Sequence, residues 1–368
     1  MKVLFVIGSL NCGGAERQFI ELTSRIGEYG ITPVICTLEK NNSSYDKIYL
    51  DRNVRHFKLL RRIKLDIKLV RNLCRIVKSE QTDIIQSWQP LAGMYSLLAS
   101  KIMGKPLVCS SIRDAKEKNS FLELFSKKCQ AYFSDVFVAN SNQGFRSQFK
   151  KWRTNFMVIK NGIDMERFKN TNSSKIQSIY NTYQCRNKFV IGMVANLSER
   201  KDPFTLIKAA ALIRNQIPNL EIFIIGDGKE KKFAQKLSDQ LGVNDIVHLI
   251  GFKHDIENYI SIFDVAVLLT NTEKHQEGIS NFLLESIAMR KVVIATRGGG
   301  NQEIIRNGIT GYLVRPKDEK DLYKKILMIK THDQSALIDR AYNMLIDNFN
   351  MGGYVSKYYH TYQSLLSD

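Results

Sequence analysis

The stretch that decides the fold class is Val3 to Arg17, which reads V-L-F-V-I-G-S-L-N-C-G-G-A-E-R. An apolar run rich in β-branched residues is followed by glycines and an amphipathic stretch that ends at Gly30, which predicts a strand, a loop and a helix. Unpaired N–H groups and the helix dipole at such a loop attract an anion. Because Gly13 and Gly14 have no Cβ, a diphosphate or a sugar can approach the backbone there, although a plain turn for strand–helix packing explains the same residues.

The same alternation of short apolar strands and helical stretches continues along the chain in two series, which predicts an α/β fold with parallel sheets. The expected strands of the first series are Val3–Ile7, Pro33–Leu38, Asp83–Ile85, Leu107–Cys109 and Val136–Ala139. Those of the second series are Phe189–Val194, Leu220–Ile225, Ile246–Leu249, Val265–Leu269, Val292–Ala295 and Tyr312–Val314. With 368 residues, of which 44% are hydrophobic, the chain has the length of two medium domains, one for each series.

A polar, irregular segment separates the two series. Residues Lys169 to Lys175 read K-N-T-N-S-S-K, so the predicted boundary gives a first domain of residues 1–171 and a second of residues 172–351. The tail, residues 352–368, carries tyrosines at nearly helical spacing. We expect it to pack as a helix, with the first domain as the candidate partner.

Positive charge is concentrated in the first half of the chain. The net charge is +18, and residues 1–170 contribute +14 of it, with 29 Lys/Arg against 15 Asp/Glu. At helical spacing, five cations share one face: Lys64, Lys68, Arg71, Arg75 and Lys78. Such a stripe attracts an anionic membrane surface by about 1 kcal/mol per residue, and a solvated helix face is the alternative. A nucleic-acid partner is disfavoured, because no helix-turn-helix, zinc or RNA-binding signature accompanies the stripe.

Cysteine and histidine patterns argue against a metal site. The six cysteines form no C-x-x-C pair and the six histidines do not cluster, so we expect reduced cysteines, no structural metal and no cofactor. No apolar stretch approaches the roughly 20 residues that a membrane-spanning helix needs, and the apolar opening lacks a cleavage site. These features together predict a cytoplasmic protein.

Two glutamates flank a second glycine-containing loop. Residues Glu277 to Glu285 read E-G-I-S-N-F-L-L-E and follow an expected strand. A helix that starts near Ser280 or Asn281, with Ser280 as its cap, would direct backbone N–H groups toward a phosphate. These donors would be Gly278, Ile279, Ser280 and Asn281. Glu285 would then accept the hydroxyls of a ribose, and Glu277 would accept those of a transferred sugar. The alternative is that both glutamates face solvent on a helix surface and bind nothing.

A cationic pair follows the first strand of the second series. Arg200 and Lys201 lie in the loop that leads into an expected helix over Phe204–Asn215. At the carboxyl end of a strand they can neutralise a departing diphosphate, whose charge grows in the transition state, although a solvated pair is also common. A nicotinamide-binding protein is disfavoured, because the first loop is not G-x-G-x-x-G and Leu38-Glu39-Lys40 offers no clean ribose-binding acid.

Taken in order, these motifs resemble glycosyltransferase family 4 over nearly the whole chain. The matching segments are Gly13–Arg17, Val158–Asp164 with Phe168, Asn196–Lys201, Gly226–Gly228, Gly251–Phe252, Glu277–Glu285, Gly298–Gly299 with Glu303, and Gly308 with Gly311. The resemblance implies a GT-B fold, in which two Rossmann-like domains with parallel sheets face each other across a deep cleft. It also implies a retaining sugar transfer that is independent of a metal.

The resemblance further implies roles for individual residues. Lys201 is similar to the family's diphosphate-binding lysine, Glu285 to its ribose-binding glutamate, and Glu277 to the glutamate that positions the donor sugar. The catalytic set is then Glu277, Lys201 and Arg200. The donor-binding set is Gly13, Gly14, Asn196, Phe252, Gly278, Ile279, Ser280, Asn281 and Glu285.

The chain departs from the family pattern at two places. Asn196 stands where the family commonly has an arginine, so either Arg200 takes over its charge or the donor phosphate is held more weakly. Trp88 stands near the position where many members carry a histidine. For Trp88 core packing is favoured over stacking on an acceptor sugar, for which it is a candidate, and Arg113 is a candidate for holding a phosphate or an acceptor hydroxyl.

The expected function is a retaining glycosyltransferase that moves a sugar from a UDP- or GDP-sugar to a hydroxyl of a lipid-linked or cell-surface oligosaccharide. Such reactions build polysaccharide, lipopolysaccharide or capsule, and the expected location is the inner face of a membrane. Two alternatives are a sugar-nucleotide epimerase of the same fold and an inactive nucleotide-sugar-binding protein. Sparse histidines weigh against the epimerase, whereas Lys201, Glu277 and Glu285 weigh against the inactive protein.

Overall fold

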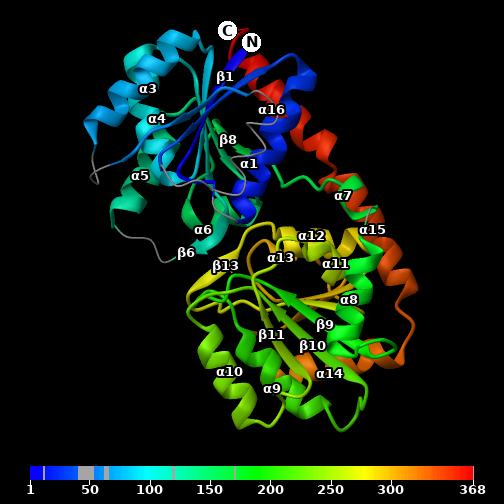
Figure 1. Cartoon of the computed structure of the whole chain (residues 1–368). Coiled ribbons are helices and arrows are strands. Elements are labelled where there is room, and N and C mark those ends of the chain that lie inside the picture. The colour runs from blue at the N-terminus through cyan, green and yellow to red at the C-terminus, as the bar shows by residue number, and fades with distance from the viewer. Residues whose placement is uncertain (11–12, 40–53, 62–65, 118–120, 170, 368) are drawn as a thin grey trace. The chain divides into compact units, whose positions relative to one another are not determined.

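The computed structural model describes residues 1–10, 13–39, 54–61, 66–117, 121–169 and 171–367 of the chain. These residues form two compact units (Figure 1). Unit 1 comprises Met1–Gly162 and Met351–Asp368, and unit 2 comprises Ile163–Asn350. Each unit is an α/β domain built on a parallel sheet with an apolar core on either face.

The sheet of unit 1 has seven strands, and all neighbouring strands run parallel. In spatial order they are β3 (His56–Lys58), β2 (Thr32–Thr37), β1 (Lys2–Ile7), β4 (Ile84–Trp88), β5 (Leu107–Ile112), β7 (Val136–Ala139) and β8 (Phe156–Val158). A further short strand, β6, spans Asp114–Glu117. The strand order reverses between β1 and β4, and in open α/β sheets ligands bind beyond the carboxyl ends of the strands at such a point.

Helices cover both faces of this sheet, with α3, α4 and α5 on one face and α1 and α16 on the other (Figure 1). The helices of unit 1 are α1 (Gly14–Arg25), the 3₁₀ helix η1 (Ile26–Tyr29), α3 (Ile67–Glu80), α4 (Pro90–Met103), α5 (Phe121–Phe133), α6 (Asn142–Gln148) and α16 (Met351–Ser364). Alternate side chains of β1 enter different cores, as strand geometry requires. Leu4 and Val6 pack with α3 and α4, whereas Val3 and Phe5 pack with α1 and α16.

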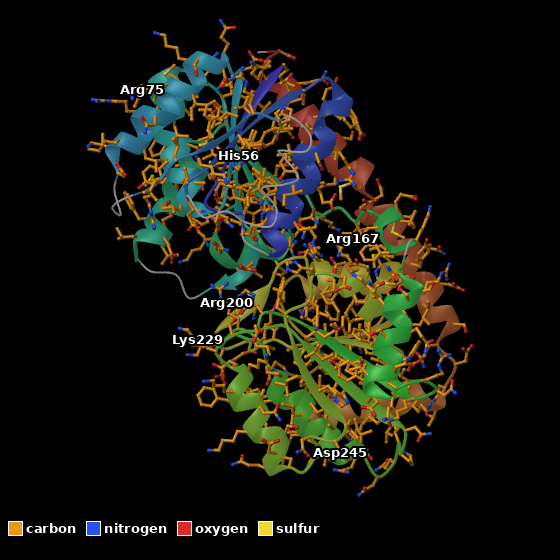
Figure 2. All side chains as sticks on the ribbon, viewed as in Figure 1. His56, Arg75, Arg167, Arg200, Lys229 and Asp245 are labelled. Carbon is orange, nitrogen blue, oxygen red and sulfur yellow. The ribbon has the colours of Figure 1, made fainter. Side chains whose placement is uncertain are left out.

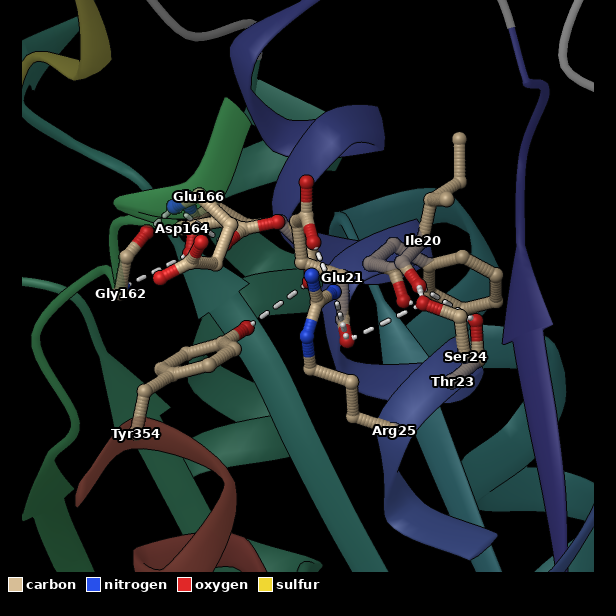
Figure 3. Close-up of polar contacts among 11 residues, drawn as sticks. Ile20, Glu21, Thr23, Ser24, Arg25, Gly162, Asp164, Glu166 and Tyr354 are labelled. Carbon is tan, nitrogen blue, oxygen red and sulfur yellow. Dashed lines mark hydrogen bonds and ion pairs between the residues drawn. The ribbon is translucent and has the colours of Figure 1, made fainter. Parts of the chain in front are cut away.

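The C-terminal helix α16 is part of unit 1, the candidate partner, although the spacing of the tyrosines could not decide between the two units. Its tyrosines Tyr354, Tyr358 and Tyr362 are buried. The Tyr354 hydroxyl donates a hydrogen bond to the backbone oxygen of Gln18 in α1 at 3.0 Å, and Figure 3 shows the Tyr354 ring reaching from α16 toward that helix. The Tyr358 hydroxyl lies 2.9 Å from Ser110 Oγ, in β5. The tail therefore completes one of the two cores of unit 1.

The sheet of unit 2 has six parallel strands. In spatial order they are β11 (Val247–Gly251), β10 (Leu220–Ile225), β9 (Phe189–Val194), β12 (Val265–Leu268), β14 (Val292–Thr296) and β15 (Tyr312–Val314). A short additional strand, β13, spans His275–Glu277. In β12, Ala266 and Leu268 pack in one core and Val265 and Val267 in the other, so this near-continuous apolar run is buried on both faces.

Nine helices lie in the described part of unit 2, and several are initiated by side-chain caps. They are α7 (Glu166–Lys169), α8 (Ser173–Tyr183), α9 (Pro203–Ile213), α10 (Lys231–Gln240), α11 (Ile256–Ser261), α12 (Asn281–Ala288), α13 (Asn301–Ile304), α14 (Glu319–Thr331) and α15 (Ser335–Phe349). Asn172 caps α8 and Asp202 caps α9, in each case by accepting a hydrogen bond from a backbone N–H in the first turn.

Every strand expected from the sequence is present, with shifts of a few residues at the ends. The strands β3 and β8 were not expected, because each has only three residues and, unlike the equally short edge strand β15, is not buried along its length. The contact boundary at Gly162 comes before the predicted boundary at residue 171. The reason is that Ile163 and Phe168 already pack in a core of unit 2, ahead of the polar segment that suggested the boundary.

Candidate functional site

Lys201 and Glu277 form a buried ion pair at the carboxyl edge of the unit 2 sheet. Lys201 Nζ lies 2.5 Å from Glu277 Oε1, and the two side chains are 16% and 10% exposed. Thr270 Oγ1 donates a hydrogen bond to the same carboxylate oxygen at 3.0 Å. His275 Nε2 lies 3.6 Å from that oxygen. Two residues singled out from sequence are thus in contact, together with two polar neighbours that the sequence reasoning missed.

Backbone contacts hold together the two loops that carry this pair. Lys201, in the loop after β9, forms an isolated antiparallel bridge with Thr270, in the loop after β12. The Asp202 N–H donates to Leu269 O at 3.0 Å. The Asp202 carboxylate also caps α9 by accepting from the Thr205 N–H at 3.1 Å. These contacts fix the backbone of Lys201 relative to β12, which is the kind of support that keeps a functional side chain in one place.

The surroundings of Glu277 keep its carboxylate charged. Burial alone would raise the pKa of Glu277, but attraction to Lys201 and the hydrogen bond and charge of His275 outweigh it and lower the pKa well below the ordinary 4.5. Glu277 is therefore ionised at neutral pH and acts only as a hydrogen-bond acceptor. This is the state needed to accept hydroxyl groups.

His275 and Glu277 are also groups that can ligate a metal ion. The Lys201 ammonium group, 2.5 Å from Glu277 Oε1, competes with any cation for that oxygen. The absence of a metal from the chemistry stays a prediction.

Glycines 298 to 300 pass against the backbone of the Glu277 loop. The Gly300 N–H donates to Glu277 O at 2.7 Å. A Cβ on Gly300 would lie 2.2 Å from Gly278 O, and one on Gly299 would lie 2.5 Å from Glu277 O. Gly299 also has a φ of +57°, which favours glycine. The glycine run therefore permits the close approach that holds Glu277 in its loop.

The helix start predicted beside Glu277 is confirmed, because α12 begins at Asn281 with Ser280 in the N-cap position. The prediction that the Ser280 side chain caps the helix is wrong, since it makes no capping hydrogen bond. Gly278 and Ile279 are buried just ahead of the helix. The first N–H groups of an α-helix have no partner within that helix and carry a partial positive charge, so this segment suits an anion. Its role in phosphate binding stays a prediction.

Glu285, the predicted ribose-binding glutamate, is paired with an arginine that the sequence reasoning missed. Arg167 Nη1 lies 3.4 Å from Glu285 Oε1, and Arg167 Nη2 lies 2.8 Å from Glu257 Oε2. The Glu285 side chain is 2% exposed, whereas those of Arg167 and Glu257 are 25% and 20% exposed. The three residues come from α7, α12 and α11 of unit 2.

The remaining donor candidates of unit 2 lie at its surface. Asn196 and Arg200 are exposed, and Figure 2 labels Arg200. The Arg200 carbonyl accepts a hydrogen bond from the Asn271 N–H at 2.9 Å. Phe252 is 47% exposed, and its N–H donates to Asp227 Oδ2 at 3.2 Å. The donor-binding roles of Asn196, Arg200 and Phe252 stay predictions.

In unit 1, Gly13 is the N-cap residue of α1 and Gly14 is its first helical residue. A Cβ on Gly13 would lie 2.2 Å from Glu16 Oε2, so the missing side chain leaves space for Glu16. Glu16 in turn accepts a hydrogen bond from Gln89 Nε2 at 2.7 Å, and burial raises the pKa of Glu16. This contact joins α1, which follows β1, to Gln89, which follows β4. The strand order of the sheet reverses between these two strands. A packing role therefore accounts for Gly13, and donor binding by Gly13 and Gly14 stays a prediction.

Trp88, a candidate for stacking on an acceptor sugar, is fully buried. Its ring lies 5.6 Å from that of Phe19 and 5.8 Å from that of Tyr358, measured between centroids. The Arg113 guanidinium carbon lies over the Trp88 ring, 3.9 Å from the centroid. Because an indole with no exposed face cannot stack on a sugar, the sugar-stacking prediction is wrong and the core-packing alternative is correct. Acceptor binding by Arg113, which is partly buried, stays a prediction.

The predicted basic stripe lies on α3. Lys68, Arg71, Arg75 and Lys78 are all exposed, and Figure 2 shows Arg75 on the outer side of that helix. Lys64, the first member of the stripe, lies outside the described residues. Across the described ranges, no helix combines the length and apolar character needed to cross a bilayer.

Of the missed residues, His275 left a usable signal in the sequence, whereas Arg167 did not. His275 precedes Glu277 by two positions, and alternate residues of a strand share a face, so their contact follows once β13 is recognised. Arg167 lies next to Phe168, which the sequence motif included, but the acids it meets are far away along the chain. Only the folded arrangement identifies that contact.

Two family profiles match the chain. Residues 182–351 match the family described as "Glycosyl transferases group 1". Residues 12–167 match the family described as "Glycosyltransferase Family 4". The matches correspond to the two series of strands.

Curated proteins and solved structures are similar to the chain along most of its length. It is 27% identical over 337 residues to the UDP-Gal:alpha-D-GlcNAc-diphosphoundecaprenol alpha-1,3-galactosyltransferase of Escherichia coli, with 84% of each chain covered. It is 25% identical over 345 residues to the lipopolysaccharide core biosynthesis glycosyltransferase LpsE of Rhizobium meliloti (strain 1021), with 92% of each covered. Anabaena Alr3699/HepE in complex with UDP-glucose superposes with a TM-score of 0.87 at 21% identity, covering 99% of this chain and 100% of that one.

Proposed function

The chain belongs to the group 1 glycosyltransferases of the family 4 type and has the GT-B fold, and on that premise we propose that it is a retaining enzyme. The proposed reaction transfers a sugar from a UDP- or GDP-sugar to a hydroxyl of a lipid-linked or cell-surface oligosaccharide. The observation that carries the proposal is the Lys201–Glu277 pair beside the start of α12. It combines a cation for a leaving phosphate, a charged acceptor for sugar hydroxyls and a helix N-terminus in one unit.

In the proposed mechanism, unit 2 binds the donor and stabilises the charge that develops on it. As the bond between the sugar and the diphosphate lengthens, negative charge grows on the leaving phosphate oxygens. In this proposal Lys201, Arg200 and the N–H groups at the start of α12 meet that charge, which lowers the barrier because the interaction strengthens in the transition state. No cofactor is required for this step.

Retention follows if the acceptor hydroxyl attacks from the same side as the leaving group. The new glycosidic bond forms at the anomeric carbon as the bond to the phosphate breaks, and the phosphate oxygen takes the proton of the hydroxyl. Glu277 accepts hydroxyls of the donor sugar and fixes its orientation, so the enzyme contributes placement and charge stabilisation rather than proton transfer. The buried, ionised state of Glu277 supports this role.

The donor and acceptor classes are supported by the names of similar proteins. The E. coli relative is named for UDP-Gal and for a diphosphoundecaprenol-linked acceptor, and the Anabaena structure holds UDP-glucose. We propose the same classes for this chain, with the GDP-sugar alternative kept open. Arg113 in unit 1 is the remaining acceptor candidate, because Trp88 is excluded by its burial.

An anionic membrane surface is the proposed partner of the outer face of α3 to α5 in unit 1. The exposed cations Lys68, Arg71, Arg75 and Lys78 on α3 supply electrostatic attraction. Exposed apolar side chains on α4 and α5 supply area that can enter the interface: Leu98, Ile102, Leu122, Phe125 and Tyr132 are 46%, 67%, 62%, 54% and 59% exposed. The three helices lie side by side in Figure 1. This face would bring a lipid-linked acceptor to the enzyme.

The catalytic proposal is tested by following nucleotide release and product formation. UDP- and GDP-sugars are supplied with a diphosphoundecaprenol-linked acceptor sugar, and the anomeric configuration of the product is read by NMR. Lys201→Met and Glu277→Gln should each lower transfer by about 10² to 10³, the effect of removing one oriented charge-stabilising group. The control is Lys175→Ala, which removes the exposed pair with Asp255 in the same unit. An inverted product, or full activity in both variants, would refute the proposal.

The membrane proposal is tested by flotation with vesicles of neutral lipid and with vesicles containing anionic lipid. Glutamine at Lys68, Arg71, Arg75 and Lys78 should abolish the preference for anionic vesicles. The control carries glutamine at exposed cations of unit 2: Lys229, Lys232 and Lys236. Equal flotation of both variants and the parent contradicts a role for α3.

A further inference from the structure

Arg167 bridges two acids that come from different helices of unit 2. Its Nη2 donates to Glu257 Oε2 at 2.8 Å and its Nη1 to Glu285 Oε1 at 3.4 Å. The nearly inaccessible Glu285 thus has a cation at its carboxylate, whereas the Glu257 end of the bridge is partly open to solvent. The bridge is therefore a fixed connection between α11 and α12, made through α7.

The position of Arg167 is itself fixed by packing. The guanidinium carbon lies 5.2 Å from the centroid of the neighbouring Phe168 ring. Phe168 is buried in the core that also contains Leu284, next to Glu285 in sequence. Arg167 consequently has little freedom to leave the two carboxylates, and an error in its position would be transmitted to Glu285.

We propose that Arg167 is a positioning residue that holds the Glu285 carboxylate, charged and oriented, for the ribose hydroxyls of the donor nucleotide. This inference rests on the proposed function, in which Glu285 accepts those hydroxyls. A carboxylate that is almost fully buried is costly without an opposite charge at its oxygens, and Arg167 supplies one. Hydrogen bonds from hydroxyls to a carboxylate are charge-assisted and therefore strong.

The guanidinium group suits this task better than an ammonium group. Its N–H donors lie in one plane at fixed angles, so a single side chain can contact two carboxylates and set the direction of both. A lysine at position 167 would keep the charge but would not impose the same geometry. Arg167→Lys therefore separates orientation from charge compensation.

The experiment compares nucleotides that differ only in the ribose hydroxyls. Calorimetry measures the affinity of the full chain for UDP and GDP, and then for the 2′-deoxy and 3′-deoxy forms of the tighter ligand. If Glu285 accepts the hydroxyls, the parent should favour the ribonucleotide by about tenfold or more, the size of a hydrogen bond to a charged group. Glu285→Gln should lose most of that preference.

Arg167→Lys should reduce the same preference to about threefold or less while leaving the affinity for the deoxynucleotides within about twofold. A purely structural role would instead weaken all the nucleotides equally. Glu257→Gln, which removes the other end of the bridge, should give an intermediate preference and serves as the deciding variant if Arg167→Lys does not fold. The matched control is Lys169→Ala, on the same helix, which removes only an exposed pair with Glu166.

The outcomes separate this inference from the proposed function. If the parent binds neither UDP nor GDP, the proposed function fails. If Glu285→Gln loses the ribose preference but Arg167→Lys and Glu257→Gln both keep the preference of the parent, the proposed function stands and the positioning role of Arg167 is refuted.

Discussion

Replacing Lys201 with methionine removes the ammonium group that compensates Glu277 and leaves a side chain of similar length. Both partners are less than one fifth exposed, so water can replace the lost charge only in part. Removing one partner of a buried ion pair costs roughly 3–5 kcal/mol, because the other charge stays buried without compensation. Thr270 and His275 still contact Glu277, so we expect the lower end, about 3 kcal/mol. For a domain of the size of unit 2 this corresponds to about 6–12 °C in Tm.

A double-mutant cycle distinguishes this charge effect from lost packing. Thermal unfolding is followed for the parent, Lys201→Met, Glu277→Gln and the combination of the two. The combination should be more stable than Lys201→Met alone, because the neutral amide needs no cation. If Lys201→Met shifts Tm by less than about 2 °C, or if the two changes simply add, Glu277 does not depend on Lys201 and the reasoning is refuted.

Three further predictions follow from the same structure. The pKa of Glu277 is lower in the folded state than the ordinary 4.5, so its charge contributes stability above pH 4.5 that is lost as the pH falls toward the folded-state pKa. Urea unfolding between pH 7 and pH 3 should therefore show a smaller loss of stability for Glu277→Gln than for the parent. An equal loss of stability in the two proteins would contradict this. Gly300→Ala should destabilise unit 2 by about 1–3 kcal/mol, since the new Cβ would lie 2.2 Å from Gly278 O. The control is Gly27→Ala, whose Cβ would have nothing within 4 Å and which should change Tm little. Similar changes in Tm for both variants would refute the contact argument. Burial raises the pKa of Cys109 to about 12, so a thiol reagent at pH 8 should label Cys109 only after denaturation, and rapid labelling of the native chain would count against the burial.

The fold was predictable because its signals are local. The apolar runs of β9 and β10 coincide with the predicted strands, since strands in the interior of a parallel sheet are buried on both faces and read as continuous apolar segments. The start of α12 was predictable for a similar reason, because Gly278 and Ser280 interrupt the strand pattern just before an apolar helix. Short edge strands such as β3 lack this pattern and were missed.

The candidate site was predictable only in part, because its contacts join distant segments. Glu277 and Lys201 were identified from their loops, but Thr270 and His275 complete the group through a bridge between the loops after β9 and β12. The sugar-stacking role considered for Trp88 failed for the same reason. A tryptophan at the end of a strand has the same sequence signal whether it faces a ligand or a core, and here α16 from the far end of the chain covers it.

The return of α16 to unit 1 sets the order in which the two units can be completed during synthesis. All segments of unit 2 lie before Met351, so its whole sequence is synthesised before that of α16. Unit 1 begins first but must wait for Tyr354, Tyr358 and Tyr362, whose rings fill one of its cores. Until α16 packs, the first domain leaves uncovered the apolar side chains that these rings contact.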